Sequence, residues 1–401
     1  VGRSSGVLAV WWFDEKRMCD RPVAVVRAIA VAVRAARGRS TRAAAPATSR
    51  PQLRAHVWMD MPSGPQLTAL CEAVDSDAVQ LTVGATSCPA DTEVCVLDPN
   101  LLPDDLQGLA SLRALRALIL PYAGLLPKHL DPLRAAFGER LGTTVQLHNV
   151  HHNAASTAEM AVALLLAAAK LLVPADRRLR EGDWRPRGYP YPGRLEGPMG
   201  MIGLEGQTAL VLGLGAVGLR VARSCAALGM RVLAVRRSAA PGGEQLEGGL
   251  VAHPPSELHR LLPRAAALLV CVPSTAETAA LVGAAELALL PPRAVLVNVA
   301  RGDVVDERAL YEALAERRLH AAGIDVWWRY PASYAQACST PPSAYPFHEL
   351  DNVVMSPHRG GGVGTPDLEL LRMRHVGRAL TEAGRNGVGQ MSHRWDFARG
   401  Y

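Results

Sequence analysis

A glycine-rich turn between two apolar runs is the feature that most limits what this chain can fold into. Residues 208–238 read TALVLGLGAVGLRVARSCAALGMRVLAVRRS. This pattern predicts, in order, a buried strand, a helix and a second strand, at 209–212, 216–228 and 231–235. Gly213, Gly215 and Gly218 stand at G-x-G-x-x-G spacing between the first strand and the helix. The order of elements is that of a dinucleotide-binding fingerprint, whereas an isolated glycine turn has no such context.

Each position of the turn has a physical reason. Gly213 allows the tight turn, Gly215 lets the backbone approach a pyrophosphate, and Gly218 lets helix and strand pack closely. A diphosphate would then lie on the free N–H groups at the helix N-terminus, where Ala216 and Val217 stand. The sequence therefore predicts a dinucleotide as the cofactor.

The end of the second strand bears on the choice between NAD and NADP. An NAD site usually has Asp or Glu about 20 residues after the glycines, where it accepts hydrogen bonds from the ribose. Here Arg236, Arg237 and Ser238 occupy that region. Guanidinium groups would attract a ribose 2′-phosphate, although two solvated arginines on a loop are the alternative. We expect NADP or NAD, with NADP favoured.

The positive charge of the chain is concentrated at its start. The 401 residues carry a net charge of +6, but residues 1–55 alone carry +8 and the rest −2. A nucleic-acid-binding domain needs its own basic face, so no nucleic-acid partner is expected. Residues 21–55 combine eight arginines with many alanines and no acid, which is typical of an organelle transit peptide. A disordered basic tail and sequence from an imperfect gene model are the alternatives. We expect residues 1–54 to lie outside the fold, and the protein to reside in a chloroplast or mitochondrion if they are a transit peptide, otherwise in the cytoplasm.

The rest of the chain alternates short strands and helices. From Ala55 a small α/β domain is predicted, and from the fingerprint onward the alternation indicates a doubly wound parallel sheet. A capping box of Ser156 and Glu159 predicts a helix from Met160 to Leu172. The apolar run at 160–169 is too short to cross a membrane, so no membrane partner is expected. The Pro-, Gly- and Tyr-rich residues 184–201 suggest an arm against a partner subunit or the neighbouring domain.

Ligands in such sheets bind beyond the carboxyl ends of the strands, and chemically useful side chains follow several of these strands. They are Arg301, Asp325 and His358. Hydride transfer to a carbonyl needs a partner for the developing oxyanion and a proton donor, for which histidine is well suited. A forked guanidinium such as that of Arg301 can bind a carboxylate and polarise a neighbouring carbonyl. A 2-oxo acid fits this description. Cofactor contacts are expected at the same strand ends from Val272, Pro273, Thr278, Val299 and Ala300.

The chain resembles the D-isomer-specific 2-hydroxyacid dehydrogenases. It shares GLGAVG, CVPSTAET, NVARGDVVDERAL, AAGIDVW and SPHRGG with them, in this order, over about residues 55–385. The resemblance implies that Arg301 binds the substrate carboxylate and carbonyl, that His358 exchanges the proton, and that Asp325 helps to place the nicotinamide. It also implies that Ala123 and Gly124, and with them Asn153, contact the substrate.

The family's domain order is the expected one. The resemblance implies two Rossmann-like domains with doubly wound parallel sheets and a discontinuous substrate domain. The expected boundaries are 55–152 and 357–390 for the substrate domain, 153–356 for the dinucleotide-binding domain and 391–401 for a tail. A homodimer joined through the cofactor domains is implied as well.

One position departs from the family. Most members pair the histidine with a glutamate five residues after the aspartate of the DV motif, and that position is Tyr330. A carboxylate partner raises a histidine's pKa, so imidazolium is expected to be less available here. We hypothesise that Tyr330 or Glu349, which follows the inserted residues 331–347, partners His358.

Three interpretations of function follow. The first is an NAD(P)-dependent reductase of a small 2-oxo acid such as glyoxylate, hydroxypyruvate or pyruvate. The second is a cofactor-sensing binding protein of the same fold, for which the missing glutamate leaves room. Formate oxidation is a weaker third interpretation.

No metal site is expected. Adjacent residues such as His151 and His152 would point apart on a strand or a helix, and we interpret both as residues of an interdomain loop.

Overall fold

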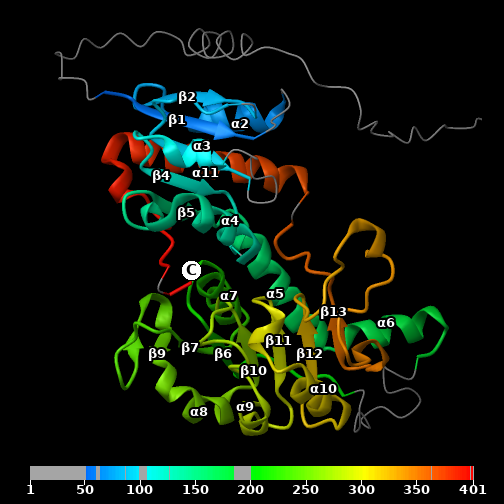
Figure 1. The fold of residues 1–401 in the computed structure, drawn as a ribbon. Coiled ribbons are helices and arrows are strands. Elements are labelled where there is room, and N and C mark those ends of the chain that lie inside the picture. Colours follow the sequence, from blue (N-terminus) through cyan, green and yellow to red (C-terminus); the bar gives the residue numbers. More distant parts are fainter. Residues whose placement is uncertain are drawn as a thin grey trace, which may run out of the picture.

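The chain forms two α/β units, each built around a mainly parallel sheet (Figure 1). The computed structural model describes residues 51–59, 64–85, 87–98, 106–125, 127–184, 200–362, 364–397 and 399–400. Residues 1–50 and 185–199 lie outside the described residues, so the transit peptide and most of the predicted arm stay predictions.

The larger unit contains an eight-stranded sheet with the order β13-β12-β11-β10-β6-β7-β9-β8. Neighbouring strands are parallel except β8 and β9. The strands are β6 (Thr208–Leu212), β7 (Arg231–Val235), β8 (Glu244–Gln245), β9 (Val251–His253), β10 (Ala267–Val270), β11 (Val295–Asn298), β12 (Ala321–Ile324) and β13 (Val353–Met355). The chain leaves β6 toward β7 on one side and later returns to β10 on the other. The carboxyl end of β6 is therefore the switch point at which such sheets bind ligands.

Helices cover both faces of this sheet because alternate strand residues point to opposite sides. Ala209 and Val211 pack with α5 (Ala154–Ala169) and α7 (Ala216–Ala227), whereas Leu210 and Leu212 share the opposite core. That opposite core also takes in residues of α8 (Leu258–Leu261), α9 (Ala284–Leu289) and α10 (Glu307–Ala315). The predicted doubly wound parallel sheet is confirmed.

The smaller unit has a five-stranded parallel sheet with the order β2-β1-β3-β4-β5. Its strands are β1 (Leu53–Trp58), β2 (Val79–Val83), β3 (Val94–Leu97), β4 (Ala117–Leu120) and β5 (Gln146–Asn149). Its helices are α2 (Pro65–Ala73), α3 (Leu106–Ser111), α4 (Pro127–Phe137) and α11 (Pro366–Asn386).

Helix α11 returns from the far end of the chain to complete the smaller unit (Figure 1). A Cβ atom on Gly377 would lie 2.7 Å from the Cβ of Ala73, so the helix lies directly on α2. The Asp75 amide also donates to Thr381 Oγ1 at 2.9 Å. The two-unit fold with a discontinuous smaller unit therefore has the expected form.

Two of the expected domain boundaries differ from the structure. Strand β1 begins at Leu53, so the folded part starts two residues before the predicted position 55. Residues 391–401 are expected to form a tail, but Trp395 is buried in the core of the smaller unit. Its amide donates to the carbonyl of Leu147 at 2.7 Å, so this segment extends the sheet beyond β5.

The predicted start of the interdomain helix is also wrong. Helix α5 begins at Ala154 with Asn153 as its N-cap residue, and that residue makes no side-chain cap bond. Ser156 and Glu159 therefore lie inside the helix and form no capping box. Helix α6 (Leu172–Arg180) follows α5 after a bend of 64°. Among the described residues no single helix is long and apolar enough to span a membrane. The bent pair of α5 and α6 reaches the length and apolar composition of a membrane span only when the two helices are taken together.

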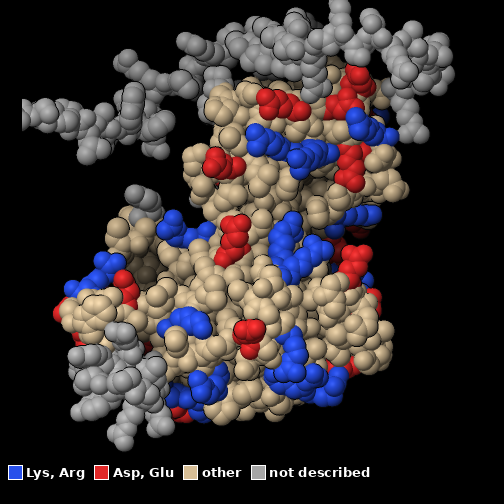
Figure 2. Space-filling model, turned by 180° about the vertical axis from the view of Figure 1, so that it is seen from behind, with Lys and Arg blue, Asp and Glu red and all other residues tan. Residues whose placement is uncertain are grey.

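Charged side chains are interspersed on the described surface. In the view from behind, Lys and Arg alternate with Asp and Glu over both units (Figure 2). The expectation of no nucleic-acid partner stays a prediction.

Candidate active site

A cleft of about 2140 Å³ lies beyond the carboxyl ends of the central strands of the larger unit, and residues of the smaller unit form its other wall. Almost all predicted site residues line it: Ala123, Gly124, Asn153, Gly213, Gly215, Ala216, Val217, Arg236, Arg237, Val272, Pro273, Thr278, Val299, Ala300, Arg301, Asp325, Tyr330 and His358. Gly218 is the exception. A Cβ there would overlap the carbonyl oxygen of Gly213, so this glycine allows α7 to pack on the turn.

The glycine turn has the shape that a dinucleotide requires. Gly213 adopts a φ of 96°, and a Cβ at that position would lie 2.8 Å from Val272 Cγ1. Gly215 is the N-cap residue of α7 and has no atom within 4 Å of its missing Cβ, so its backbone faces open cleft. Free N–H groups at a helix N-terminus bind phosphate well. These residues fit the pyrophosphate of a nicotinamide dinucleotide.

Arg301 follows β11 and crosses the cleft toward the smaller unit. Its guanidinium donates to the carbonyl of Ala300 at 2.7 Å and lies so close to Gly124 that a Cβ there would overlap it. The Asn298 amide fixes the turn, since it donates to the carbonyl of Arg301 at 2.9 Å and accepts from Ala300 N at 3.0 Å. Burial lowers the pKa of Arg301, but guanidinium stays charged in proteins. A fixed positive charge thus faces the Gly124 turn.

His358 lies on a turn with a left-handed backbone, φ 57°, which a non-glycine residue adopts only when its surroundings impose it. The buried Asp325 carboxylate imposes it here. Its oxygens accept from Ser356 Oγ at 2.5 Å and from the amides of Arg359 at 2.8 Å and Gly360 at 2.9 Å. Asp325 therefore holds the turn that presents His358, in addition to lining the cleft.

Tyr330 is the side chain that contacts His358. Its hydroxyl lies 2.9 Å from Nδ1 of His358 and accepts from the Trp327 amide at 3.0 Å. Glu349, the other hypothesised partner, is exposed and lies 3.9 Å from His348 instead. Of the two candidates, only Tyr330 is in place to orient the imidazole.

The surroundings of His358 disfavour its charged form. Burial lowers its pKa most, the charge of Arg301 lowers it further, and the carboxylate of Asp325 acts in the opposite direction. Burial raises the pKa of Tyr330, so its hydroxyl stays protonated at neutral pH. A neutral hydroxyl stabilises imidazolium less than a carboxylate does.

Sequence reasoning missed two contributors to the cleft. Trp327 donates its indole N–H to the carbonyl of Ser356 at 2.8 Å and so helps to fix the turn that carries His358. The C-terminal segment lines the cleft with His393–Phe397, Arg399 and Gly400. Two large aromatic residues, Trp395 and Phe397, stand in a stretch without helical or strand periodicity. They were the available signal that this segment is packed.

The two adjacent histidines point to different surroundings. His151 contacts the ring of His393 edge-on at 4.7 Å, while His152 is buried. Burial lowers the pKa of each to about 4. Within the described part of the chain, no group of three or more His, Cys, Asp or Glu residues is arranged to hold a metal ion.

Fold and site together define a two-domain dinucleotide-binding α/β protein. The sequence profile of the D-isomer specific 2-hydroxyacid dehydrogenase NAD binding domain matches residues 162–360. Just under half of the chain therefore matches the NAD binding domain of that family.

Similar proteins agree with this assignment. A D-3-phosphoglycerate dehydrogenase from Archaeoglobus fulgidus is 40% identical over 210 residues, which are 51% of this chain and 35% of the relative. A glyoxylate reductase from Thermococcus onnurineus is 37% identical over 207 residues, 51% of this chain and 56% of the relative. The chain thus aligns with little more than half the length of these relatives at most.

A solved structure shares the whole fold. The D-isomer specific 2-hydroxyacid dehydrogenase of Xanthobacter autotrophicus Py2, in complex with NADPH and MES, superposes with a TM-score of 0.62 at 23% identity. The match covers 86% of this chain and 100% of that chain. At this identity the likeness concerns the fold alone.

Proposed function

We propose that this chain is an NAD(P)-dependent reductase that converts a small 2-oxo acid, of the glyoxylate, hydroxypyruvate or pyruvate type, to the D-2-hydroxy acid. The observation that carries the proposal is that Arg301 and His358 line the same cleft as the glycine-rich turn. A carboxylate-binding cation and a proton donor beside a dinucleotide site are what reduction of a 2-oxo acid needs. Relatives named glyoxylate reductase support the same substrate class.

In this proposal the substrate carboxylate lies between Arg301 and the turn at Ala123 and Gly124. The Asn149 side-chain amide donates to the carbonyl of Ala123 at 2.9 Å and fixes that turn. The guanidinium binds the carboxylate and polarises the adjacent carbonyl oxygen, which carries negative charge as the reaction proceeds. NAD(P)H supplies the hydride when it is bound.

His358 supplies the proton. Its Nδ1 faces Tyr330, which leaves Nε2 as the ring nitrogen for the substrate oxygen. The imidazolium gives its Nε2 proton to that oxygen and becomes neutral, with Nδ1–H donating to the Tyr330 hydroxyl. In the reverse direction, neutral Nε2 accepts the proton from the hydroxy acid. Nδ1 carries its proton in both states, so the hydroxyl accepts from it throughout and keeps the ring oriented.

A panel of 2-oxo acids with NADH and with NADPH, followed by nicotinamide absorbance, tests the proposal. We expect turnover with at least one of glyoxylate, hydroxypyruvate and pyruvate. Tight cofactor binding without turnover on any of them would reject it.

That second outcome would favour a cofactor-sensing binding protein. The specific observation in favour of that protein class is that, among the described residues, a hydroxyl and no carboxylate contacts His358, whose pKa is lowered. The retention of both Arg301 and His358 in the cleft favours the enzyme.

Assembly and location remain proposals of the same kind. Light scattering of the full chain tests the predicted homodimer. A fluorescent fusion to residues 1–54 tests the predicted organellar location.

A further inference from the structure

The C-terminal segment, residues 391–400, is anchored on the smaller unit. The Asn149 amide donates to the carbonyl of His393 at 3.1 Å, and His148 and Arg394 form an antiparallel bridge. The buried Trp395 ring then packs in the core of that unit. The first part of the segment is therefore held beside β5.

From there the segment crosses to the larger unit. Phe397 packs on Gly142, where a Cβ would lie 2.8 Å from its ring, and Arg134 lies 5.8 Å from the ring centroid. At the other end, a Cβ on Gly400 would lie 3.7 Å from Thr275 Cγ2, in the loop after β10. In Figure 1 the described part of the red C-terminal segment accordingly ends between the two units, near the loops of the cofactor unit.

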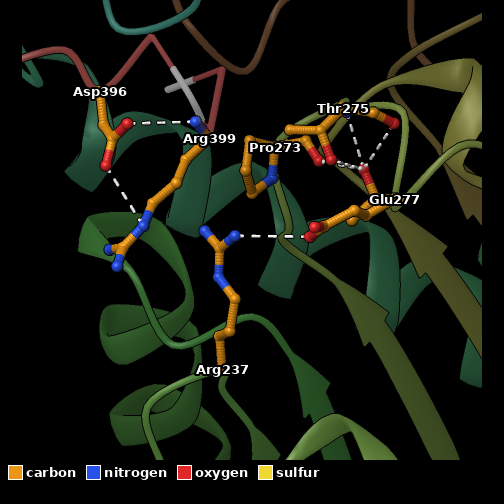
Figure 3. Close-up of polar contacts among 7 residues, drawn as sticks. Arg237, Pro273, Thr275, Glu277, Asp396 and Arg399 are labelled. Atoms are coloured by element: carbon orange, nitrogen blue, oxygen red, sulfur yellow. Dashed lines mark hydrogen bonds and ion pairs between the residues drawn. The ribbon is translucent and has the colours of Figure 1, made fainter.

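This path brings Arg399 to the part of the cleft that Arg237 enters from the end of β7. Figure 3 shows Arg237 reaching up beside Pro273 with its guanidinium turned toward Glu277, and Arg399 reaching down beside Arg237 with its guanidinium on the Asp396 side. Both arginines line the cleft. Arg236, by contrast, is held by Glu244 at 2.5 Å. The second cation at this place thus comes from the C-terminal segment.

Each of the two arginines has a weak anionic neighbour. Arg399 Nε lies 3.2 Å from Asp396, and Arg237 lies 3.4 Å from Glu277, whose side chain is 77% exposed. Exposed pairs of this kind contribute little and are screened by salt. A phosphate dianion forms stronger, charge-assisted bonds to guanidinium and can replace the carboxylates.

We propose that Arg399 and Arg237 together bind the 2′-phosphate of NADPH, so that the two units share one phosphate subsite. In a dinucleotide fold the ribose hydroxyls lie at the end of the second strand, where Arg237 stands. The inference rests on the nicotinamide cofactor of the proposed function, but on none of its substrates. It makes the C-terminal segment a determinant of cofactor preference.

Binding measurements on the full chain test this subsite without turnover. Dissociation constants for NADPH, NADH and 2′,5′-ADP are measured by calorimetry for the wild type, Arg399→Ala and Arg399→Glu. We expect Arg399→Ala to weaken NADPH and 2′,5′-ADP about tenfold, because one charge-assisted bond is lost. Arg399→Glu should weaken both further through repulsion, and NADH should keep its affinity in each variant.

Arg385→Ala is the matched control. Arg385 has the same side-chain exposure as Arg399, 64%, but pairs with Asp75 on the smaller unit away from the cleft. It should change no dissociation constant. Equal weakening of NADPH and NADH by Arg399→Ala, or no change in either, would overturn the subsite. Normal NADPH binding without 2-oxo acid turnover would reject the proposed function alone.

Discussion

At the scale of single residues, the contact between Tyr330 and His358 sets the pH dependence of the proposed reaction. Reduction needs imidazolium, and burial with the charge of Arg301 lowers the pKa of His358 below its usual 6.5. The charged fraction therefore grows as the pH falls. We expect kcat for reduction to rise from pH 8 toward pH 5.5, and kcat for oxidation to rise in the opposite direction. Stopped-flow rates in both directions measure this, and a reduction rate independent of pH would contradict it.

Variants of Tyr330 test the same contact. Tyr330→Phe removes the hydroxyl that orients the ring, so kcat for reduction should fall about tenfold, within the range of general acid catalysis. Tyr330→Glu introduces a carboxylate beside the imidazole and should move the pH limb upward by about one unit. Glu349→Gln is the control and should leave the pH profile unchanged. A pH limb that does not move in Tyr330→Glu would exclude Tyr330 as the partner.

The proposed role of Arg301 in binding the substrate carboxylate depends on its forked guanidinium as well as on its charge, and a lysine variant distinguishes the two. Arg301→Lys keeps a cation but loses the fork that matches a carboxylate. We expect kcat/KM for 2-oxo acids to fall by about 10²–10³, as for loss of an oxyanion partner, while the dissociation constant for NADPH stays within about twofold. A loss confined to cofactor binding would place Arg301 outside the substrate site.

At the scale of elements, two glycines of the turn before α7 have different roles. Gly218 allows the helix to pack on the turn, whereas Gly215 leaves room for the cofactor. A Cβ at Gly218 would overlap the carbonyl oxygen of Gly213, whereas a Cβ at Gly215 meets no atom within 4 Å. Gly218→Ala should therefore lower the free energy of unfolding by about 1–3 kcal/mol, as overpacking does. Gly215→Ala should fold normally but weaken NADPH and NADH alike, because the methyl group projects where the pyrophosphate approaches.

Thermal unfolding and cofactor titration of both glycine variants check this. Gly215→Ala is the stability control for Gly218→Ala. Equal melting temperatures, or unchanged cofactor affinity in Gly215→Ala, would contradict the roles assigned to the turn.

At the scale of the whole molecule, nine of the twelve histidines have a lowered pKa, with burial as the first cause in each. The folded state binds these protons less readily than the unfolded chain does. The contribution of these histidines to the free energy of unfolding is thus fully present above pH 6.5. It is lost as the pH falls toward about 4, the pKa of His151 and His152. We expect the melting temperature to fall steadily over this interval, as measured by calorimetry.

Replacing one of these histidines tests whether histidine protonation causes the fall in melting temperature. His151→Gln cannot take up a proton and should reduce the loss between pH 6.5 and 4. The same change at the exposed His348 is the control. A melting temperature that is constant over this interval would contradict the assignment.

The sequence by itself determined the elements that are local or periodic. The apolar runs, the glycine spacing and the order of strands and helices specified the doubly wound sheet, since strand faces and turn conformations depend on neighbouring residues. The same order placed Arg301, Asp325 and His358 at one edge, because parallel strands end together. The start of α5 escaped prediction because a capping motif competes with the packing of the whole helix on the sheet.

Only the tertiary structure decided which side chains meet across the cleft. Tyr330 and Glu349 were equal candidates along the chain, and the backbone after β12 brings only Tyr330 to His358. The C-terminal segment has no periodic pattern, so its path depends on the pocket that receives Trp395 and on the edge of β5. Contacts between residues hundreds of positions apart depend on how the two units pack, and no local pattern encodes that packing.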